Sequence, residues 1–240
     1  MLISHIEDKL ALCYTQDVPQ YSDFLSMEEV AYVRSFLENT SVYYSFWGGY
    51  TDSQRQMVGI STDRIDEFPI TILRGTWDRF GDIGHRDVLG ALTASGVDRK
   101  CIGDILIDAD KRCFYVFVCS RMADYFCQNV QSVGRCSIRW SVVDDVSVLP
   151  QAKAEELRIP VSSLRIDVIL SAVYHLSRND SARLISDKKV YVNHMPILKA
   201  TYNLIPECSV VVRGLGKFIF LEQQGFSKKG KAYILVKRFI

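Results

Sequence analysis

The spacing of apolar residues changes several times along the chain, and each change marks an expected helix or strand. Residues 3–14 carry apolar side chains at helical intervals, and a second helix is predicted to begin at Ser26, where Glu29 completes a capping box. Two strand-like runs follow, at residues 42–47 and 56–61, around a stretch rich in turn residues that indicates a hairpin. Together these elements predict an N-terminal α/β segment, residues 1–67.

Residues 68–148 are predicted to form a ferredoxin-like domain. The six expected elements run in the order βαββαβ, an arrangement shared by many RNA-binding domains. In the third strand, Tyr115 and Phe117 point to one face and could stack bases if that face were open, although two apolar faces are more typical of a core strand. The strands are expected at residues 70–73, 102–107, 113–119 and 136–143, and the helices at 85–95 and 122–130.

The last third of the chain, residues 161–240, is predicted to begin with two short helices and to continue as strands. Helix 165–174 has one apolar side, and Ser177 is the expected N-cap of the second helix. Pro150 and Pro160 flank the expected domain boundary, a short helical connector over residues 149–160. Strands are expected at 190–193, 206–214, 217–222 and 231–239, and the basic stretch 223–230 is a hairpin loop, either a solvated turn or an RNA contact.

Charge is divided unevenly along the chain. Residues 158–240 hold 14 Lys or Arg against 5 Asp or Glu, whereas residues 1–157 hold 15 against 23. The net charge of +1 at pH 7 conceals this asymmetry. A basic C-terminal part indicates a polyanion-binding end, and an acidic remainder disfavours non-specific coating of nucleic acid.

Several cations of the basic part lie outside the apolar sides of its two helices. Their clustering beside a helix pair and a sheet edge is an electrostatic footprint for the phosphates of a folded RNA. Asp167 is expected to orient Arg165 or to cap the helix rather than to contact RNA. The clustered cations are Arg178, Arg183, Lys188 and Lys189.

A longer motif runs through the same part of the chain. It consists of Arg165-x-Asp167, Ser177-Arg178, Ala182, Leu184-Ile185, Val190-x-Val192-Asn193 and Val212-Arg213-Gly214. This motif resembles the RNA-binding module first described in the small-subunit ribosomal protein S4. The resemblance implies an S4-type RNA-binding domain whose RNA-binding residues are Arg165, Asp167, Arg178, Arg183, Lys188, Lys189, Asn193, Arg213 and Lys217.

The chain departs from the usual pattern of this module at its turns. Lys189 and His194 stand where glycines are usual, and Cys208-Ser209 replaces a common Gly-Asp pair. Because those glycines serve tight turns, the departures bear on turn geometry more than on the RNA-binding face. On that face the arginines are expected to contact phosphates or stack on bases. Lys188 is expected to act as a point charge and Asn193 to bond a sugar hydroxyl.

Three further motifs extend the resemblance over nearly the whole chain. They are Phe46-x-Gly48-Gly49-Tyr50, His85-x-Asp87-x-Leu89-Gly90-Ala91-Leu92 and Ile102-Gly103-Asp104-Ile105-Leu106. They resemble the bacterial YlmH-type RNA-binding proteins, which place the S4-type module last, after an α/β segment and a ferredoxin-like middle domain. The resemblance implies a non-enzymatic, cytoplasmic factor that binds ribosomal RNA or tRNA on the large ribosomal subunit, in quality control of stalled nascent chains.

Two other functions stay open. An RNA-modifying or tRNA-charging enzyme can also carry this module, but the sequence has no catalytic motif of either kind. His85 and Asp87, the nearest approach to an acid/base pair, are two residues apart and do not face each other on a helix. A cell-division adaptor would use the acidic N-terminal segments as its contact surface, and division proteins would then be its partners.

The cysteines and the apolar runs indicate which features the protein is expected to lack. Seven cysteines without metal-ligand spacing predict reduced, mostly buried thiols and no metal or other cofactor. No apolar run reaches transmembrane length, so no membrane insertion is expected. A monomer is the default expectation.

Overall fold

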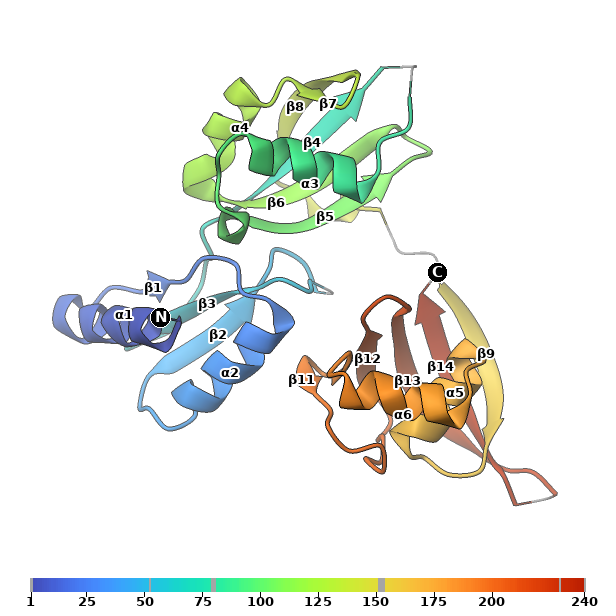
Figure 1. Cartoon of the computed structure of the whole chain (residues 1–240). Helices are drawn as coiled ribbons and strands as arrows, with labels where there is room; N and C mark the ends of the chain where they lie inside the picture. Colours follow the sequence, from blue (N-terminus) through green and yellow to red (C-terminus); the bar gives the residue numbers. More distant parts are fainter. Residues whose placement is uncertain (1, 52, 79–80, 151–153, 229, 240) are drawn as a thin grey trace. The chain divides into compact units, whose positions relative to one another are not determined.

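The computed structural model describes residues 2–51, 53–78, 81–150, 154–228 and 230–239. The chain divides into two compact units, unit 1 with residues 1–150 and unit 2 with residues 151–240 (Figure 1). Both units mix helices with sheets, so the predicted α+β class is confirmed. Unit 1 contains the N-terminal segment and the middle domain, and unit 2 contains the basic module.

The N-terminal segment consists of α1 (Leu2–Gln16), β1 (Gln20–Tyr21), α2 (Met27–Leu37), β2 (Tyr43–Trp47) and β3 (Met57–Ser61). The predicted capping box starts α2, because Glu29 donates its N–H to Ser26 Oγ at 3.3 Å and Ser26 donates its N–H to Glu29 Oε2 at 2.7 Å. The strands form a sheet in the order β1-β3-β2. The predicted hairpin is confirmed as the antiparallel β2–β3 pair.

The middle domain has the predicted βαββαβ order. Its elements are β4 (Ile70–Trp77), α3 (His85–Ala94), β5 (Ile102–Asp108), β6 (Cys113–Cys119), α4 (Ala123–Asn129) and β8 (Cys136–Val143), with a short β7 (Ser132–Val133) before the last strand. The sheet order is β5-β6-β4-β8-β7, with antiparallel neighbours throughout. β4 is longer than the predicted strand 70–73, because its later residues pair with β8 as well as with β6.

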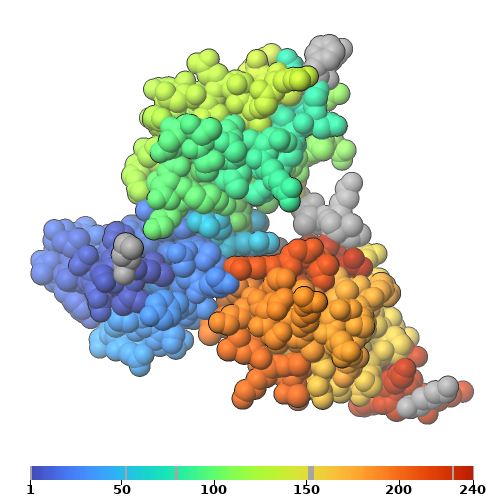
Figure 2. Space-filling model, viewed as in Figure 1, coloured from blue at the N-terminus to red at the C-terminus, as the bar shows by residue number. Residues whose placement is uncertain are grey.

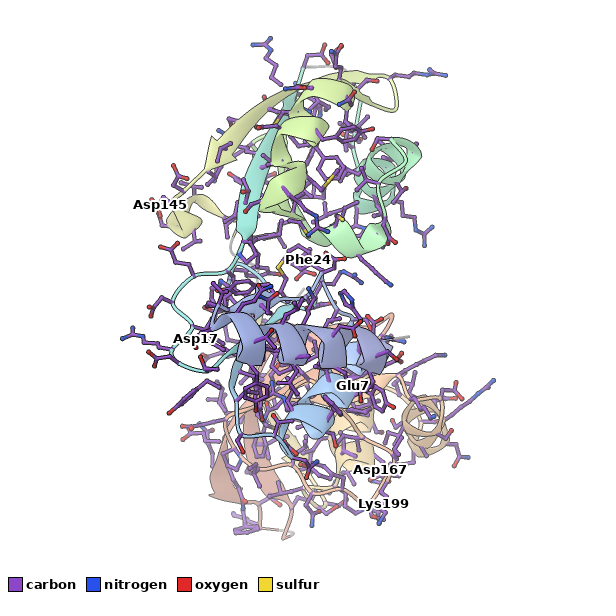
Figure 3. The ribbon with its side chains drawn as sticks, turned by 90° about the vertical axis from the view of Figure 1, so that its left-hand side faces the viewer. Glu7, Asp17, Phe24, Asp145, Asp167 and Lys199 are labelled. Carbon is purple, nitrogen blue, oxygen red and sulfur yellow. The ribbon has the colours of Figure 1, made fainter. Side chains whose placement is uncertain are left out.

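Both faces of the middle sheet are covered. Phe114 and Val116 pack with side chains of α3 and α4. Tyr115 and Phe117 point to the opposite face and are only 2% and 0% exposed, because residues of the N-terminal segment and residues 148–149 cover this face. Phe24 belongs to this second core (Figure 3), and the ring of Tyr50 stacks on Phe117 with centroids 4.9 Å apart. Base stacking on an open face of β6 is therefore wrong.

The turn of the β2–β3 hairpin fits against this second core. Gly49 has a φ of +99°, and a Cβ atom at this position would collide with the ring of Phe117. Beyond the turn, the Asp104 carboxylate accepts hydrogen bonds from Tyr50 Oη at 2.9 Å and from the backbone N–H groups of Gln54 at 2.6 Å and Arg55 at 3.1 Å. Burial raises the pKa of Asp104, and these hydrogen bonds oppose that rise. The N-terminal segment is thus bonded to β5 as well as packed on β6.

Unit 2 contains β9 (Ala154–Val161), α5 (Ile166–Tyr174), α6 (Arg178–Ser186), β10 (Val190–Val192), β11 (Met195–Pro196), β12 (Cys208–Val212), β13 (Gly216–Phe226) and β14 (Ala232–Phe239). Its sheet has the order β11-β10-β12-β13-β14-β9. Both helices pack on one face of this sheet (Figure 1), and the core between them includes Ile169, Val173, Ile185, Phe218 and Phe220. The β13–β14 hairpin projects from the unit (Figure 2).

Two boundary predictions are wrong. The helical connector over residues 149–160 is contradicted, since β9 starts at Ala154 and pairs with β14 over its whole length. Residues 151–153, the rest of that helical prediction, lie outside the described residues. The predicted loop 223–230 is also shorter than expected, because β13 continues to Phe226. Long-range pairing decides both cases, and the local composition of these stretches does not reveal it.

The turns of unit 2 accommodate the missing glycines in two ways. Lys188, rather than Lys189, adopts the left-handed conformation, with a φ of +56°. Asn193 and His194 both have positive φ and connect β10 to β11 as a two-residue turn, since Val192 pairs with Met195. Asn and His are among the non-glycine residues that adopt this conformation most often. The absence of glycine at positions 189 and 194 therefore changes which residues adopt positive φ at these turns. β10 still pairs with β11.

The cysteines are free thiols, and all except Cys127 are buried. Cys101 and Cys119 lie close to Asp23, but the guanidinium of Arg121 already occupies this cluster, 2.6 Å from Asp23 Oδ1 and 3.5 Å from Cys101 Sγ. Burial raises the pKa of Cys119 to about 12, which keeps it a thiol. The cluster is thus held by hydrogen bonds and an ion pair. No helix among the described residues is long and apolar enough to cross a membrane.

The covered sheet face can be tested with Phe117→Ala. We expect this substitution to lower the free energy of unfolding by about 3–5 kcal/mol, because it empties a closed core. Tyr32→Ala is the control, since Tyr32 is 61% exposed on α2, and its effect should stay within about 0.5 kcal/mol. Urea denaturation followed by circular dichroism measures both. A nearly neutral Phe117→Ala that weakened RNA binding would instead show that the face is open.

Candidate RNA-binding site

The entrance of α5 holds a buried carboxylate bound by an arginine fork. Arg165 is the N-cap residue of α5, and it donates to Asp167 through Nε at 3.1 Å and through Nη2 at 3.0 Å. The Asp167 side chain is 7% exposed and that of Arg165 is 39% exposed. Asp167 Oδ1 also accepts the N–H of Val168 at 3.0 Å. As expected from the sequence, Asp167 orients Arg165 and serves the helix start.

The same carboxylate binds a second arginine. Arg178 is the first residue of α6, and its Nη2 lies 3.3 Å from Asp167 Oδ2, with 48% of its side chain exposed. Ser177 caps α6 as predicted, because its Oγ accepts the N–H of Asp180 at 3.0 Å. One buried negative charge therefore holds two half-exposed guanidinium groups. Each group keeps N–H donors toward solvent, since a guanidinium carries five and the carboxylate takes at most two of them here.

A loop between β11 and β12 forms backbone hydrogen bonds with the start of α5, where Asp167 lies. The N–H of Ile166 donates to the Tyr202 carbonyl at 2.7 Å, and the N–H of Asp167 donates to the Ala200 carbonyl at 3.4 Å. Lys199, in the same loop, is exposed and lies near Asp167 (Figure 3). Tyr202 is 41% exposed. The backbone of this loop is therefore bonded to the start of α5, and the loop carries one more cation and one aromatic ring.

Lys199 and Tyr202 were missed by the sequence analysis. The loop that carries them has no helical or strand periodicity, and only its backbone bonds to α5 place it beside Arg165. A charge and an aromatic residue three positions apart were the only sequence signal for these two residues, and it is a weak one.

A second group of predicted cations lies where α6 ends and β12 turns into β13. The N–H of Arg213 donates to the Lys189 carbonyl at 2.9 Å, so the residues that precede β10 and follow β12 lie side by side. Lys188 is exposed, and Lys189 Nζ lies 3.3 Å from Asp187 Oδ2. Arg213 lies over the ring of Tyr191, 5.3 Å from its centroid. Lys217 lies over the ring of Phe239 at 5.1 Å.

Two predicted residues stand apart from these groups. Asn193, at the far end of β10 from Lys189, accepts the N–H of Ser209 through Oδ1 at 2.9 Å. The carbonyl oxygen of its side chain therefore fixes the β10–β11 turn against β12. Arg183 is exposed on α6, but it lies five positions after Arg178, so the two do not share one helix face. The structure thus separates the nine predicted residues into an arginine pair on Asp167, a cation group at the ends of β10, β12 and β13, and two outlying residues.

This arrangement suits phosphate groups on a structured RNA. Arginine donates in a fixed fork that matches phosphate oxygens, and it can also stack on bases. An arginine already held by a carboxylate loses less conformational entropy when it binds than a free side chain does. The half-exposed guanidinium groups are therefore ready to bind an anion while the carboxylate beneath them stays buried.

Residues 64–145 match a family model described as the putative RNA-binding domain in YlmH. The chain is 25% identical over 224 residues to a Bacillus subtilis (strain 168) protein named ribosome-associated protein quality control protein P2, and the match covers 90% of this chain and 86% of that protein. Among solved structures it is similar to the cell division protein ylmH from Streptococcus pneumoniae. That likeness has a TM-score of 0.52 at 15% identity and covers 62% of this chain and 93% of the other, so it concerns the fold.

The matched middle segment and the basic module are both features expected of an RNA-binding protein. The predicted similarity to YlmH-type RNA-binding proteins is confirmed, because the family model, the Bacillus relative and the solved structure all agree with it.

Replacing Asp167 distinguishes orientation from bulk charge. Asp167→Ala makes unit 2 more cationic, yet we expect it to weaken RNA binding by about 1–2 kcal/mol, because both arginines lose the partner that orients them. Asp187→Ala removes the same charge from an exposed position, and we expect unchanged or slightly tighter binding. A gel-shift titration compares the two variants. Tighter binding by Asp167→Ala would show that only net charge matters.

Proposed function

We propose that this chain is a non-enzymatic RNA-binding factor of the ribosome. Its partners would be ribosomal RNA or peptidyl-tRNA on the large subunit, in the quality control of stalled nascent chains. The observation that carries the proposal is the buried Asp167 carboxylate, which presents Arg165 and Arg178 together on a helix pair. The name of the Bacillus relative supports the ribosomal setting.

The division of charge supports a structured RNA rather than any polyanion. Residues 158–240 are strongly basic, whereas residues 1–157 carry an excess of acidic side chains. Cations concentrated on one module neutralise several phosphates at once, and acidic surface elsewhere repels additional RNA. A factor of this kind binds a defined site on a large ribonucleoprotein and does not coat free RNA.

A non-catalytic role is supported by the structural role of Asp87, one of the two acid/base candidates. Asp87 Oδ2 accepts the N–H of Gly84 at 2.9 Å, so this carboxylate starts α3. We propose a monomeric cytoplasmic protein with an N-terminal segment over residues 1–67 and a ferredoxin-like domain over residues 68–148. The S4-type domain of the proposal includes β9 and therefore begins before residue 161.

Arg178→Ala tests the proposed contact directly. We expect RNA affinity to fall by about 1–3 kcal/mol and the slope of log K against log salt to become shallower by about one, because one charge-assisted phosphate contact is lost. Arg158→Ala is the matched control, since Arg158 is exposed on β9 and lies 4.1 Å from the Tyr233 ring centroid. Filter binding at several salt concentrations measures both. Equal losses in the two variants would remove Arg178 from the site.

Sedimentation tests the ribosomal setting. Wild-type protein in a cell lysate should migrate with large ribosomal subunits through a sucrose gradient, and a double Arg178→Ala, Lys188→Ala variant should stay near the top. The control is a double Arg158→Ala, Lys237→Ala variant, which loses the same charge from β9 and β14. If wild type and both variants all stay at the top, the ribosomal proposal fails. A division adaptor then becomes the better hypothesis, in line with the name of the Streptococcus protein.

A further inference from the structure

The outer face of the N-terminal sheet contains a hollow that RNA binding does not explain. Tyr43, Ser45 and Trp47 alternate along β2 and point away from the helices, while Tyr44 and Phe46 pack with the helix side. Because Ser45 is small and stands between two large aromatic residues, the surface is hollowed there. The hollow has a volume of about 440 Å³ and is lined by Ser45, Trp47, Asp66, Glu67 and Phe68.

The far wall of this hollow is fixed by packing on β3. Gly59 pairs with Ser45 on one side and with Tyr21 on the other. A Cβ atom on Gly59 would lie 3.2 Å from the ring of Phe68, so the glycine lets the segment with Phe68 lie close over the sheet. Tyr21 and Phe68 meet edge to face, with ring centroids 5.4 Å apart. The hollow is thus built on a sheet, with its acidic residues carried by a segment that packing holds in place.

The lining combines negative charge with aromatic rings. Asp66 pairs with Arg64 at 2.5 Å, but the two side chains are 66% and 84% exposed, and an ion pair this exposed contributes little and exchanges easily. Trp47 is 39% exposed, so part of this residue is accessible to a ligand. A guanidinium or ammonium group is attracted both by carboxylates and by the face of an indole ring. The same carboxylates repel phosphate, which makes RNA an unsuitable occupant.

The position of β2 in the sheet indicates the form of the ligand. β2 is an edge strand, and among the described residues its only strand partner is β3. An extended segment added to a sheet edge presents alternate side chains to each face of the sheet. A basic side chain on such a segment would meet the hollow beside Ser45, while the backbone of the segment paired with β2.

We propose that this hollow binds an arginine or lysine side chain of an extended, basic protein segment that pairs with the edge of β2. This second binding site has a chemistry opposite to that of unit 2. It allows unit 1 to contact a cationic protein while unit 2 contacts RNA.

The probe for this site is a fluorescently labelled short peptide in which arginine alternates with threonine. Its control replaces each arginine by citrulline, which keeps the shape of the side chain and removes the charge. Fluorescence anisotropy with the full-length protein should show saturable binding of the arginine peptide and at least about tenfold weaker binding of the citrulline peptide, equivalent to about 1.4 kcal/mol. Equal affinity of the two peptides would overturn the proposal.

Variants of the residues that line the hollow distinguish binding in this hollow from general attraction to negative charge. Asp66→Asn with Glu67→Gln removes its charge, Ser45→Phe fills it, and Trp47→Ala removes its aromatic wall. We expect each of these variants to weaken binding of the arginine peptide by at least about fivefold. Asp110→Asn with Asp144→Asn is the charge-matched control, because both carboxylates are exposed elsewhere on unit 1, and its binding should stay within about twofold of wild type.

Two results would overturn the proposal. Equal losses in the two charge variants together with normal binding by Ser45→Phe and Trp47→Ala would show attraction to net charge without a pocket. Unchanged binding in all variants would place the peptide elsewhere. RNA affinity, measured on the same preparations, should stay unchanged in every variant of the hollow, and thermal unfolding followed by circular dichroism should report correct folding of unit 1. The outcome is therefore independent of whether the proposed ribosomal function holds.

Discussion

The sharing of one buried carboxylate by two arginines is the interaction on which the basic module depends. Asp167 is nearly inaccessible to solvent, and a lone buried charge of this kind would be costly. Arg165 and Arg178 compensate it while remaining half exposed, so the cluster keeps an excess positive charge at the surface. The carboxylate also binds the start of α5 and links it to α6. The contacts that join α5 to α6 are thus the same contacts that orient Arg165 and Arg178.

In unit 1, the corresponding constraint is the closure of the middle sheet. Ferredoxin-like RNA-binding domains can use an open sheet face for stacking, but here Tyr50 and Phe24 occupy the face that carries Tyr115 and Phe117. The Asp104 carboxylate then fixes the adjoining turn through three hydrogen bonds. An RNA contact by the matched middle segment would therefore have to use edges, loops or helices. The arginine pair on Asp167 lies in unit 2.

Local signals in the sequence were sufficient for most elements and for part of the site. Ser26 and Ser177 predicted helix starts because N-caps depend on residues within one turn. The Asp167–Arg165 pair could be predicted for the same reason, since its members are two positions apart in the sequence. Predictions failed where distant strands decide the outcome. β9 has a composition that suits a helix, and only its pairing with β14 makes it a strand. The covering of Phe117 likewise depends on a segment more than sixty residues away in the chain.

The two units carry surfaces of opposite chemistry, and this separation follows from what each surface is built on. On the two short helices of unit 2, the buried Asp167 carboxylate orients the guanidinium groups of Arg165 and Arg178 while other N–H donors of these groups stay toward solvent. Carboxylates beside Trp47 and Phe68 attract a cation only if no basic residue of their own fold fills the hollow, and the exposed Arg64 holds Asp66 weakly. Acidic and basic surfaces placed on one small sheet would neutralise each other. Because the two surfaces belong to separate folding units, the charges of one are not cancelled by neighbouring charges of the other within the same sheet.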